Sequence, residues 1–360
     1  MTPFASHQPV GPAEVELPCA DLAPALEFFV GRLGFRVETI FPADAPQVAS
    51  LSGYGLRLRL APGSGDPGRI RLACRNPGSD RRLTAPNGTI VELVDDDPPI
   101  EVPPLQPEFI LSRAGEGPPA NEGRAGMRYR DLIPGRLGGR YIASHISIDE
   151  GGPVADWVHF HKIRFQMIFC RQGWARLVYE DQGPAFLFQA GDCVLQPPRI
   201  RHRVLESSSA FEVVEISCPA SHETLADHGL ELPTATLAPE RDFGGQLFHH
   251  HRAGEVPWTA HEVAGFEVRE TGVGHATRGL AEARVIRPAG GGELASPGHH
   301  GDLLFGFLLA GSAVLDHAGS RALGPADAFV IPPGGAWALR DCAEDLLLLE
   351  VTAAGSDVMT

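Results

Sequence analysis

Short apolar runs separated by turn-forming residues dominate the chain from about residue 127 onward. Runs such as RYIASHISI, FQMIFCRQ and FEVVEIS recur roughly every 8–12 residues, which is typical of the strands of a β-sandwich or β-barrel. A second block of the same kind, from FEVRET to DLLLLEV, covers about residues 262–352. The pattern therefore predicts a mainly β protein.

The two β blocks repeat each other. LLAGSAVLDHAG…LGPADAFVIPPGGAW in the second block echoes CRQGWARLVYEDQG…FQAGDCVLQPPRIRH in the first. When Gly311 is placed opposite Gly173, the repeat has a period of about 138 residues, and both copies carry a Pro-Pro pair after an apolar strand. An internal duplication of this kind predicts two related β-barrels in one chain.

The amino-terminal part of the chain has a different pattern. EVELPCA has the character of a strand, and DLAPALEFFVGRLG places apolar residues at helical spacing before a glycine stop. FRVETIF, VASLS, LRLRLA, RIRLACR and TIVELVD follow as further strands, so we predict an α+β module. The next segment is rich in Pro, Gly and acidic residues, which is typical of a linker. The predicted organisation is a module over 1–100, a linker over 101–126, and barrels over 127–235 and 236–360.

Composition and charge narrow the classes of function. Hydrophobic residues make up 43% and charged residues 21% of the chain, as in ordinary globular proteins. The net charge of −15 argues against nucleic-acid binding and against adhesion to anionic membranes. The sequence has no long apolar stretch and no signal-like start, and its six cysteines form no CxxC pair. We therefore expect a cytoplasmic protein with reduced thiols.

Three histidines in the first barrel have a spacing suited to a metal. His159 and His161 are two residues apart on a strand, so both side chains lie on the same face. His202 follows on a distant strand and can meet them, giving three imidazoles for one divalent metal. Gln166 lies between these two groups, where a carboxylate would be expected.

This spacing resembles the two sequence motifs of the cupin superfamily, in which HxH, a Glu and a later His bind the metal. The resemblance covers roughly residues 127–355 and implies a bicupin built from two double-stranded β-helix (jelly-roll) barrels. It implies the metal ligands His159, His161, Gln166 and His202. It also implies one divalent metal per chain, with Fe(II) favoured over Ni, Zn or Mn. Arg199 departs from the family pattern, because the second motif usually has Gly there.

The second barrel departs further from the cupin motifs. The same alignment places Pro297, His299, Leu304 and Trp337 in the four ligand positions. We predict that this barrel binds no metal and serves as a packing partner, with a ligand pocket lined by Trp337 as the alternative. The run His249–His251 is predicted to be an exposed linker or an interface.

The amino-terminal module resembles one βαβββ module of the vicinal-oxygen-chelate (glyoxalase-like) family. DL at 21–22, FF at 28–29, LGF at 33–35 and NGTIVEL at 87–93 carry this resemblance. The family usually pairs two such modules around a metal, but only one is evident here. Glu14 takes the position of the first-strand histidine, and Glu92 that of the last-strand carboxylate. We expect a structural or dimerising module and a homodimer, with a metal site across the dimer as the alternative.

A glutamine at position 166, in place of a glutamate, indicates that the substrate is an anion. Gln166 does not cancel any metal charge, so the metal would be a stronger Lewis acid toward an anionic compound. The candidate contacts for the substrate anion are Lys162, Arg164 and Arg201. Two further cations, Arg199 and Arg203, lie close to His202 in the sequence. Solvated charges at the rim are the alternative interpretation.

Three hypotheses of function follow. The resemblance favours a mononuclear non-haem Fe(II) dioxygenase that acts on a small anionic aromatic or enolic compound. The second is a non-oxidative Lewis-acid cupin, namely an isomerase, lyase or hydrolase that acts on a sugar acid or keto acid. The third is a bicupin that binds or senses a small molecule without turnover.

Overall fold

The computed structural model describes residues 11–117 and 120–355. The chain divides into two compact units, with the boundary between Pro99 and Ile100. Strands dominate both units, so the prediction of a mainly β protein is confirmed. No helix in the described ranges is long and apolar enough to span a membrane.

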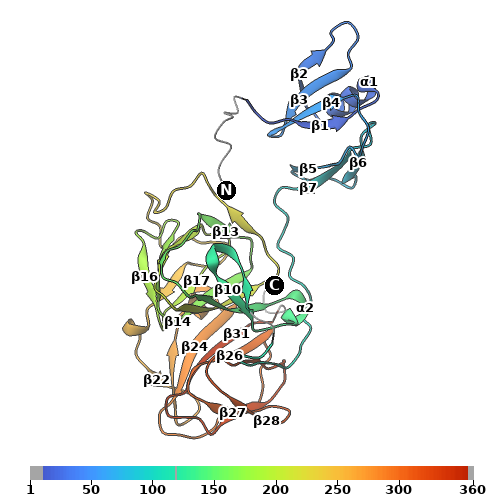
Figure 1. The fold of residues 1–360 in the computed structure, drawn as a ribbon. Helices are drawn as coiled ribbons and strands as arrows, with labels where there is room; N and C mark the ends of the chain where they lie inside the picture. Colours follow the sequence, from blue (N-terminus) through green and yellow to red (C-terminus); the bar gives the residue numbers. More distant parts are fainter. Residues whose placement is uncertain (1–10, 118–119, 356–360) are drawn as a thin grey trace. The chain divides into compact units, whose positions relative to one another are not determined.

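The first unit contains a four-stranded sheet and one helix (Figure 1). The sheet order is β1-β4-β3-β2, with β1 parallel to β4. The helix begins as an α-helix and continues directly as a π-helix, so the predicted order of strand, helix and three strands is present. The elements are β1 (Val15–Pro18), α1 (Leu22–Leu26), η1 (Glu27–Arg32), β2 (Arg36–Phe41), β3 (Val48–Gly53) and β4 (Leu56–Ala61).

A separate three-stranded sheet completes the first unit. It consists of β5 (Arg69–Cys74), β6 (Arg82–Thr84) and β7 (Ile90–Asp95), in the order β5-β7-β6. Phe29, Leu58 and Val91 are fully buried in one apolar cluster that joins the helix and both sheets. Glu92 on β7 therefore lies outside the sheet that carries β1, and its carboxylate is 3.0 Å from Arg69.

The second unit begins with a barrel of two facing sheets. The larger has the order β21-β17-β14-β19-β11-β10-β9, and the smaller has the order β16-β15-β18-β13-β20 with β12 paired to β18. The strands are β9 (Asn121–Glu122), β10 (Arg128–Asp131), β11 (Ile142–Ile148), β12 (Gly152–Pro153), β13 (His159–His161), β14 (Phe165–Gln172), β15 (Trp174–Tyr179), β16 (Phe186–Gln189), β17 (Cys193–Leu195), β18 (His202–Ser207), β19 (Phe211–Cys218), β20 (Thr224–Ala226) and β21 (His249–His251). Two short helical turns, η2 (Arg124–Gly126) and α2 (Arg136–Gly139), precede β11.

The second barrel has the same two-sheet plan. Its sheets have the orders β22-β23-β24-β31-β26-β29-β8 and β25-β30-β27-β28. The elements are β8 (Ile110–Ser112), η3 (Ala253–Glu255), β22 (Thr259–Ala260), β23 (Phe266–Glu270), α3 (Val273–Ala276), β24 (Ala281–Pro288), β25 (Leu294–Ser296), β26 (Leu303–Ala310), β27 (Ala313–Asp316), β28 (Ser320–Leu323), β29 (Ala328–Val330), β30 (Trp337–Arg340) and β31 (Leu347–Ala353).

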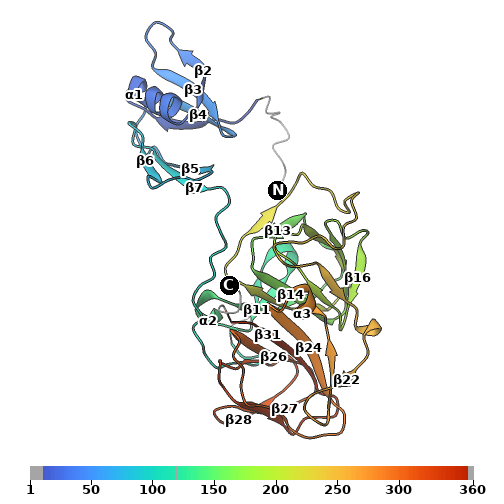
Figure 2. The ribbon, with the colours of Figure 1, turned by 180° about the vertical axis from the view of Figure 1, so that it is seen from behind.

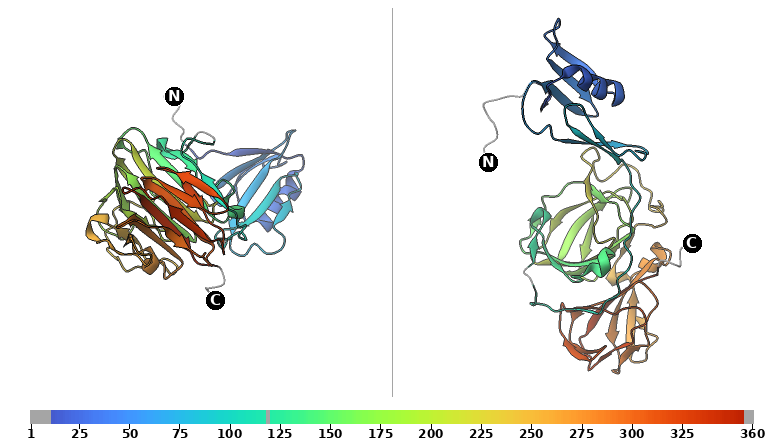
Figure 3. Two further views of the ribbon diagram at one scale, coloured as in Figure 1. Left: turned by 90° about the horizontal axis from the view of Figure 1, so that it is seen from below. Right: turned by 90° about the vertical axis from the view of Figure 1, so that its right-hand side faces the viewer.

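The two barrels pack through their larger sheets, as Figures 2 and 3 show for the green and the orange-red strands. Phe169 and Ile216 of the first barrel share one buried cluster with Phe305 and Val351 of the second. Successive residues of a strand face opposite sides, so these strands are apolar on both faces. Each buried phenylalanine or branched aliphatic side chain contributes about 1.5–3 kcal/mol, and the interface is thus a second hydrophobic core.

The barrels also exchange edge strands. β8 lies in the predicted linker but pairs with β29 of the second barrel, with Ile110 opposite Val330. β21 lies in the segment predicted for the second barrel but pairs with β17 of the first, with His251 opposite Cys193. The predicted linker is therefore more than a linker, because its short segment Ile110–Ser112 adds an edge strand to the second barrel. The run His249–His251 is a strand rather than an exposed linker.

The glycines used to align the repeat have the same structural role. Gly173 (φ 75°) directly follows β14 and Gly311 (φ 71°) directly follows β26, and both adopt the left-handed backbone conformation. A Cβ at Gly311 would lie 2.6 Å from the Leu346 backbone, and one at Gly173 would lie 2.4 Å from Ser208 Oγ. Only glycine fits such a turn without strain, which explains why the residue recurs in both copies.

Candidate metal centre

Three histidines meet inside the first barrel. His159 and His161 lie on β13, and His202 on β18 is the direct cross-strand partner of His159. Directly opposed residues share a face of the sheet, so both strands turn their imidazoles the same way. One ring nitrogen of each histidine lies within 4.8 Å of those of the other two, and all three residues are buried. The structure thus brings the three predicted histidines together, and metal binding by them stays a prediction.

Backbone carbonyls fix the tautomer of each imidazole. His159 Nδ1 lies 2.7 Å from Trp157 O, His161 Nδ1 lies 3.3 Å from Glu223 O, and His202 Nδ1 lies 3.0 Å from Ile200 O. A carbonyl only accepts, so each Nδ1 carries the proton and each Nε2 is the acceptor nitrogen of its ring. This support of a histidine from behind is typical of metal ligands. The donor set therefore fits a divalent metal.

The buried carboxylate of Asp156 lies beside His159. Asp156 Oδ1 lies 3.6 Å from His159 Nδ1, and Asp156 Oδ2 accepts a hydrogen bond from the Val204 backbone N–H. The Asp156 side chain is fully buried, so its position is fixed. It links the loop between β12 and β13 to β18.

Gln166 belongs to a buried chain of hydrogen bonds. The Tyr179 hydroxyl donates to Gln196 Oε1 at 2.5 Å, and Gln196 Nε2 donates to Gln166 Oε1 at 3.0 Å. Gln166 and Gln196 are also joined through the backbone, because Gln196 N–H donates to Gln166 O. An amide oxygen has two lone pairs, and Gln196 uses one of them. The other is left for a metal, so coordination by Gln166 stays a prediction.

The histidines form the polar end of a cavity of about 80 Å³. Tyr179, Gln196 and Glu215 line the same end. Burial, followed by the charge of Glu215, raises the pKa of Tyr179 well above its usual value, so its phenol stays protonated. Apart from Arg203, the rest of the wall is almost entirely apolar and consists of Met127, Tyr129, Ile146, Ile148, Ile168, Leu177, Phe188, Val204, Phe211 and Val213.

Comparison with known proteins identifies the architecture. No protein-family model and no curated protein matches the chain. Among solved structures, salicylate 1,2-dioxygenase from Pseudaminobacter salicylatoxidans is similar with a TM-score of 0.52 at 15% identity, covering 70% of this chain and 86% of that one. The protein Ylba from E. coli is similar with a TM-score of 0.51 at 12% identity, covering 71% and 94%. Oxalate decarboxylase from Bacillus subtilis is similar with a TM-score of 0.50 at 13% identity, covering 68% and 77%.

The chain has a cupin fold. At 12–15% identity, the likeness establishes the fold, and the chemistry has to be argued from the site. The glyoxalase-like resemblance of the first unit stays a prediction.

The cations predicted to hold a substrate anion lie away from the three histidines. Lys162, Arg164 and Arg201 do not line the histidine cavity. His202 faces into the barrel, so its neighbour Arg201 faces out, stacks 4.3 Å over the Phe160 ring and pairs with Asp227 at 3.2 Å. The structure thus corrects the expectation that these three side chains surround one anion at the metal.

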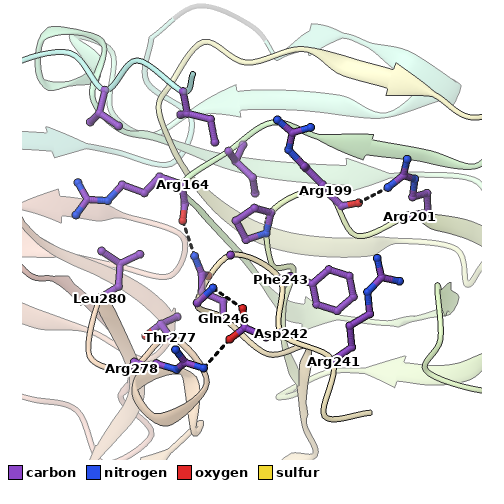
Figure 4. A pocket seen from close by; sticks show the side chains of 16 residues that line it. Arg164, Arg199, Arg201, Arg241, Asp242, Phe243, Gln246, Thr277, Arg278 and Leu280 are labelled. Carbon is purple, nitrogen blue, oxygen red and sulfur yellow. Dashed lines mark hydrogen bonds and ion pairs between the residues drawn. The ribbon is translucent and has the colours of Figure 1, made fainter. Parts of the chain in front are cut away.

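Arg164 and Arg201 line a different cavity, which has a volume of about 580 Å³ (Figure 4). Its wall also includes Arg199, Arg241 and Arg278. Figure 4 shows that the guanidinium of Arg164 points away from those of Arg199 and Arg201. Arg241 and Arg278 are paired with carboxylates, so these cations do not converge on one anion.

Arg203 differs from the other flanking cations, because it is among the residues that line the histidine cavity. Its Nε is buried without a hydrogen-bond partner.

The second cupin barrel does not repeat the histidine group. Trp337 is 5% exposed and takes the position corresponding to His202, as predicted. Within the described ranges, His159, His161 and His202 are the only group of three or more histidine, cysteine or acidic side chains close enough to hold a metal. Glu14 is exposed before β1, and Glu92 pairs with Arg69.

Proposed function

We propose that this protein is a metal-dependent cupin enzyme, specifically a mononuclear non-haem Fe(II) dioxygenase that acts on a small anionic enolic or aromatic compound. One observation carries the proposal. Three buried imidazoles, each with its Nδ1 beside a backbone carbonyl, converge on a mostly apolar cavity whose wall also includes Arg203 and Glu215. The metal would be held by His159, His161, His202 and Gln166.

The donor set favours an anionic substrate. A divalent metal bound by neutral ligands supplies a Lewis-acid centre that keeps its full charge and has open coordination positions. Glu215 contributes one negative charge to the cavity wall, so the site as a whole stays cationic. The hydrogen bonds from Tyr179 to Gln196 and from Gln196 to Gln166 fix the orientation of the Gln166 amide, which would be a neutral fourth donor.

The size and lining of the cavity restrict the substrate further. An engineered protein cavity of about 150 Å³ binds benzene, whereas this cavity measures about 80 Å³. An enolic acid of a few carbons therefore fits as the structure stands, and an aromatic acid requires side chains of the apolar wall to move. The apolar wall would exclude water from the reacting end and strengthen the electrostatic contacts there.

Glu215 supports a second candidate, the non-oxidative Lewis-acid cupin. A carboxylate in the cavity can take a proton from a substrate and return it, which isomerases and lyases require. Oxalate decarboxylase, whose fold is similar, is described with Mn(II) centres. In this candidate the substrate is a keto acid or sugar acid, and the metal is Mn, Ni or Zn.

Elemental analysis of protein purified without oxygen tests the metal centre. We expect about one metal per chain. His161→Ala and His202→Ala should fold but lose metal affinity at least about tenfold, by analogy with the roughly 10–100-fold losses caused by changes around metal ligands. His228→Ala removes an exposed histidine and serves as the control. Full metal content in both ligand variants would refute the assigned site.

Oxygen uptake against a panel of keto acids and phenolic acids separates the two candidate reactions. The dioxygenase requires uptake of O2 in step with loss of substrate. Undiminished turnover under strict anaerobiosis would eliminate it and leave the Lewis-acid cupin. Glu215→Gln should then slow turnover while leaving metal content unchanged, because it removes the proton acceptor and not a ligand.

A further inference from the structure

The cavity drawn in Figure 4 is separate from the histidine cavity, and no described residue lines both. Its wall combines the turn between β13 and β14, the loop between β17 and β18, the segment before β21 and the residues after α3. Both barrels therefore contribute to it. Its volume of about 580 Å³ lies within the roughly 300–1,000 Å³ of pockets that hold small molecules.

Apolar side chains make up a large part of this wall. Ile100, Val102 and Pro198 are half-buried, so they offer apolar surface to a ligand, and the more deeply buried Phe243 and Leu280 lie beside them. A ligand that covers these side chains removes apolar surface from water, which is favourable. The wall thus favours a ligand with an apolar body.

Arg164 adds a positive charge to this wall. Its backbone is held on both sides, because its N–H donates to Cys218 O at 2.8 Å and its carbonyl accepts from Gln246 Nε2 at 2.7 Å. Its side chain is half-buried and extends on the side of the view where Leu280 lies (Figure 4). Among the described residues, its guanidinium has neither a hydrogen bond nor an ion pair. A guanidinium binds a carboxylate through two parallel hydrogen bonds, so Arg164 can hold an anion.

The other cations of the wall argue against a ligand with several charges. Three of them already have carboxylate partners, so a second anionic group would have to compete with those carboxylates. Arg201 pairs with Asp227 at 3.2 Å, Arg241 with Glu180 at 2.8 Å and Asp181 at 2.6 Å, and Arg278 with Asp242 at 2.5 Å.

We propose that this pocket binds a small monocarboxylate with an apolar body. The carboxylate pairs with Arg164, and the apolar body lies against Ile100, Val102 and Pro198. The proposal does not rest on the proposed function, because none of the three histidines lines the pocket. It assigns the chain a second ligand site, large enough for molecules that the histidine cavity of about 80 Å³ does not hold.

Isothermal titration calorimetry of the full chain tests the ligand class. The probe is 2-naphthoate, a monocarboxylate on an apolar double ring, and we expect one binding site per chain. The neutral 2-naphthamide keeps the rings without the charge, and acetate keeps the charge without the rings. Both should bind at least about tenfold more weakly than 2-naphthoate, because each lacks one of the two interactions.

Variants of Arg164 test the position of the site. Arg164→Gln should weaken binding of 2-naphthoate at least about tenfold, the loss expected for a charge-assisted hydrogen bond. Arg164→Lys keeps the charge without the two-pronged geometry and should bind with intermediate affinity, and it serves as the second variant if Arg164→Gln does not fold. Arg252→Gln removes an exposed arginine outside the pocket and should bind as the wild type does.

His161→Ala separates this proposal from the proposed function. It removes a predicted metal ligand and should bind 2-naphthoate as tightly as the wild type does. Loss of binding in this variant would place the probe at the histidines and overturn the pocket, while leaving the proposed function intact.

Three other results would overturn the proposal. The first is the absence of binding up to about 5 mM 2-naphthoate, a range that covers millimolar dissociation constants. The second is equal affinity for 2-naphthamide, which would show that no cation is used. The third is unchanged affinity in folded Arg164→Gln or, where only the lysine variant folds, in Arg164→Lys.

Discussion

His251 makes the stability of the second unit depend on pH. It lies on the exchanged strand β21, is 2% exposed, and its Nε2 is buried without a hydrogen bond. Burial first, and then the neighbouring His249, lowers the pKa of His251 to about 4 from the ordinary 6.5. The folded state thus requires a neutral imidazole, whereas the unfolded chain accepts a proton near pH 6.5. Its contribution to stability is complete above about pH 6.5 and is lost as the pH falls toward 4.

The magnitude follows from the difference between the two pKa values. A difference of about 2.5 units corresponds to about 3 kcal/mol, reached below the folded pKa. At pH 5 the unfolded form is almost fully protonated and the folded form is not, so about 2 kcal/mol is already lost. Total stabilities of about 5–15 kcal/mol make such a loss easy to measure.

Urea unfolding followed by tryptophan fluorescence measures this loss. All four tryptophans lie beyond residue 100, so the signal reports the second unit alone. We expect wild type to lose about 2 kcal/mol more than His251→Leu between pH 8 and pH 5. The other histidines titrate in both proteins, and His228→Leu controls for an exposed position. Equal losses in wild type and His251→Leu would refute the reasoning.

Three further substitutions have defined outcomes. Gln166→Glu should weaken binding of an anionic substrate by adding a negative charge beside the metal; unchanged affinity in a titration would show that the side chain lies away from it. Tyr179→Phe leaves Gln196 Oε1 without its buried donor and should lower the free energy of unfolding by about 1–3 kcal/mol, measured in urea. Gly311→Ala should cost at least about 2 kcal/mol, because φ is 71° and a Cβ would lie 2.6 Å from backbone, whereas Gly324→Ala, with open space and an ordinary φ, should be nearly neutral; equal effects would contradict the turn argument.

The histidine group could be predicted from the sequence because the positions of its side chains follow largely from local strand geometry. His159 and His161 share a face through strand alternation alone, and the motif placed His202 with them. The same rule should have placed Arg201 on the outer face, since it precedes the inward His202. The expectation that Arg201 contacts a substrate anion at the metal did not take this alternation into account.

Other parts of the site depend on register between strands far apart in the sequence. Tyr179 and Gln196 reach Gln166 only after β15, β17 and β14 are aligned, and no local pattern fixes that alignment. Glu215 left a weak signal, because it lies between Val214 and Ile216, which face the other barrel, so strand alternation places it on the cavity side. The exchanged strands β8 and β21 are three residues long, too short for periodicity to reveal their partners.

The exchange of β8 and β21 ties the two copies of the duplication together. If the chain were cut at the end of the predicted linker, near residue 126, the second barrel would lose β8, and the edge of β29 would be exposed. A cut near residue 235 would remove β21 from the first barrel, and the edge of β17 would be exposed. Unpaired edges recruit strands from other chains, so fragments cut at these points would tend to aggregate. Each barrel therefore depends on a strand that the sequence places outside it, and the working boundaries of the two copies lie near residues 110 and 251 rather than at the ends of the repeat.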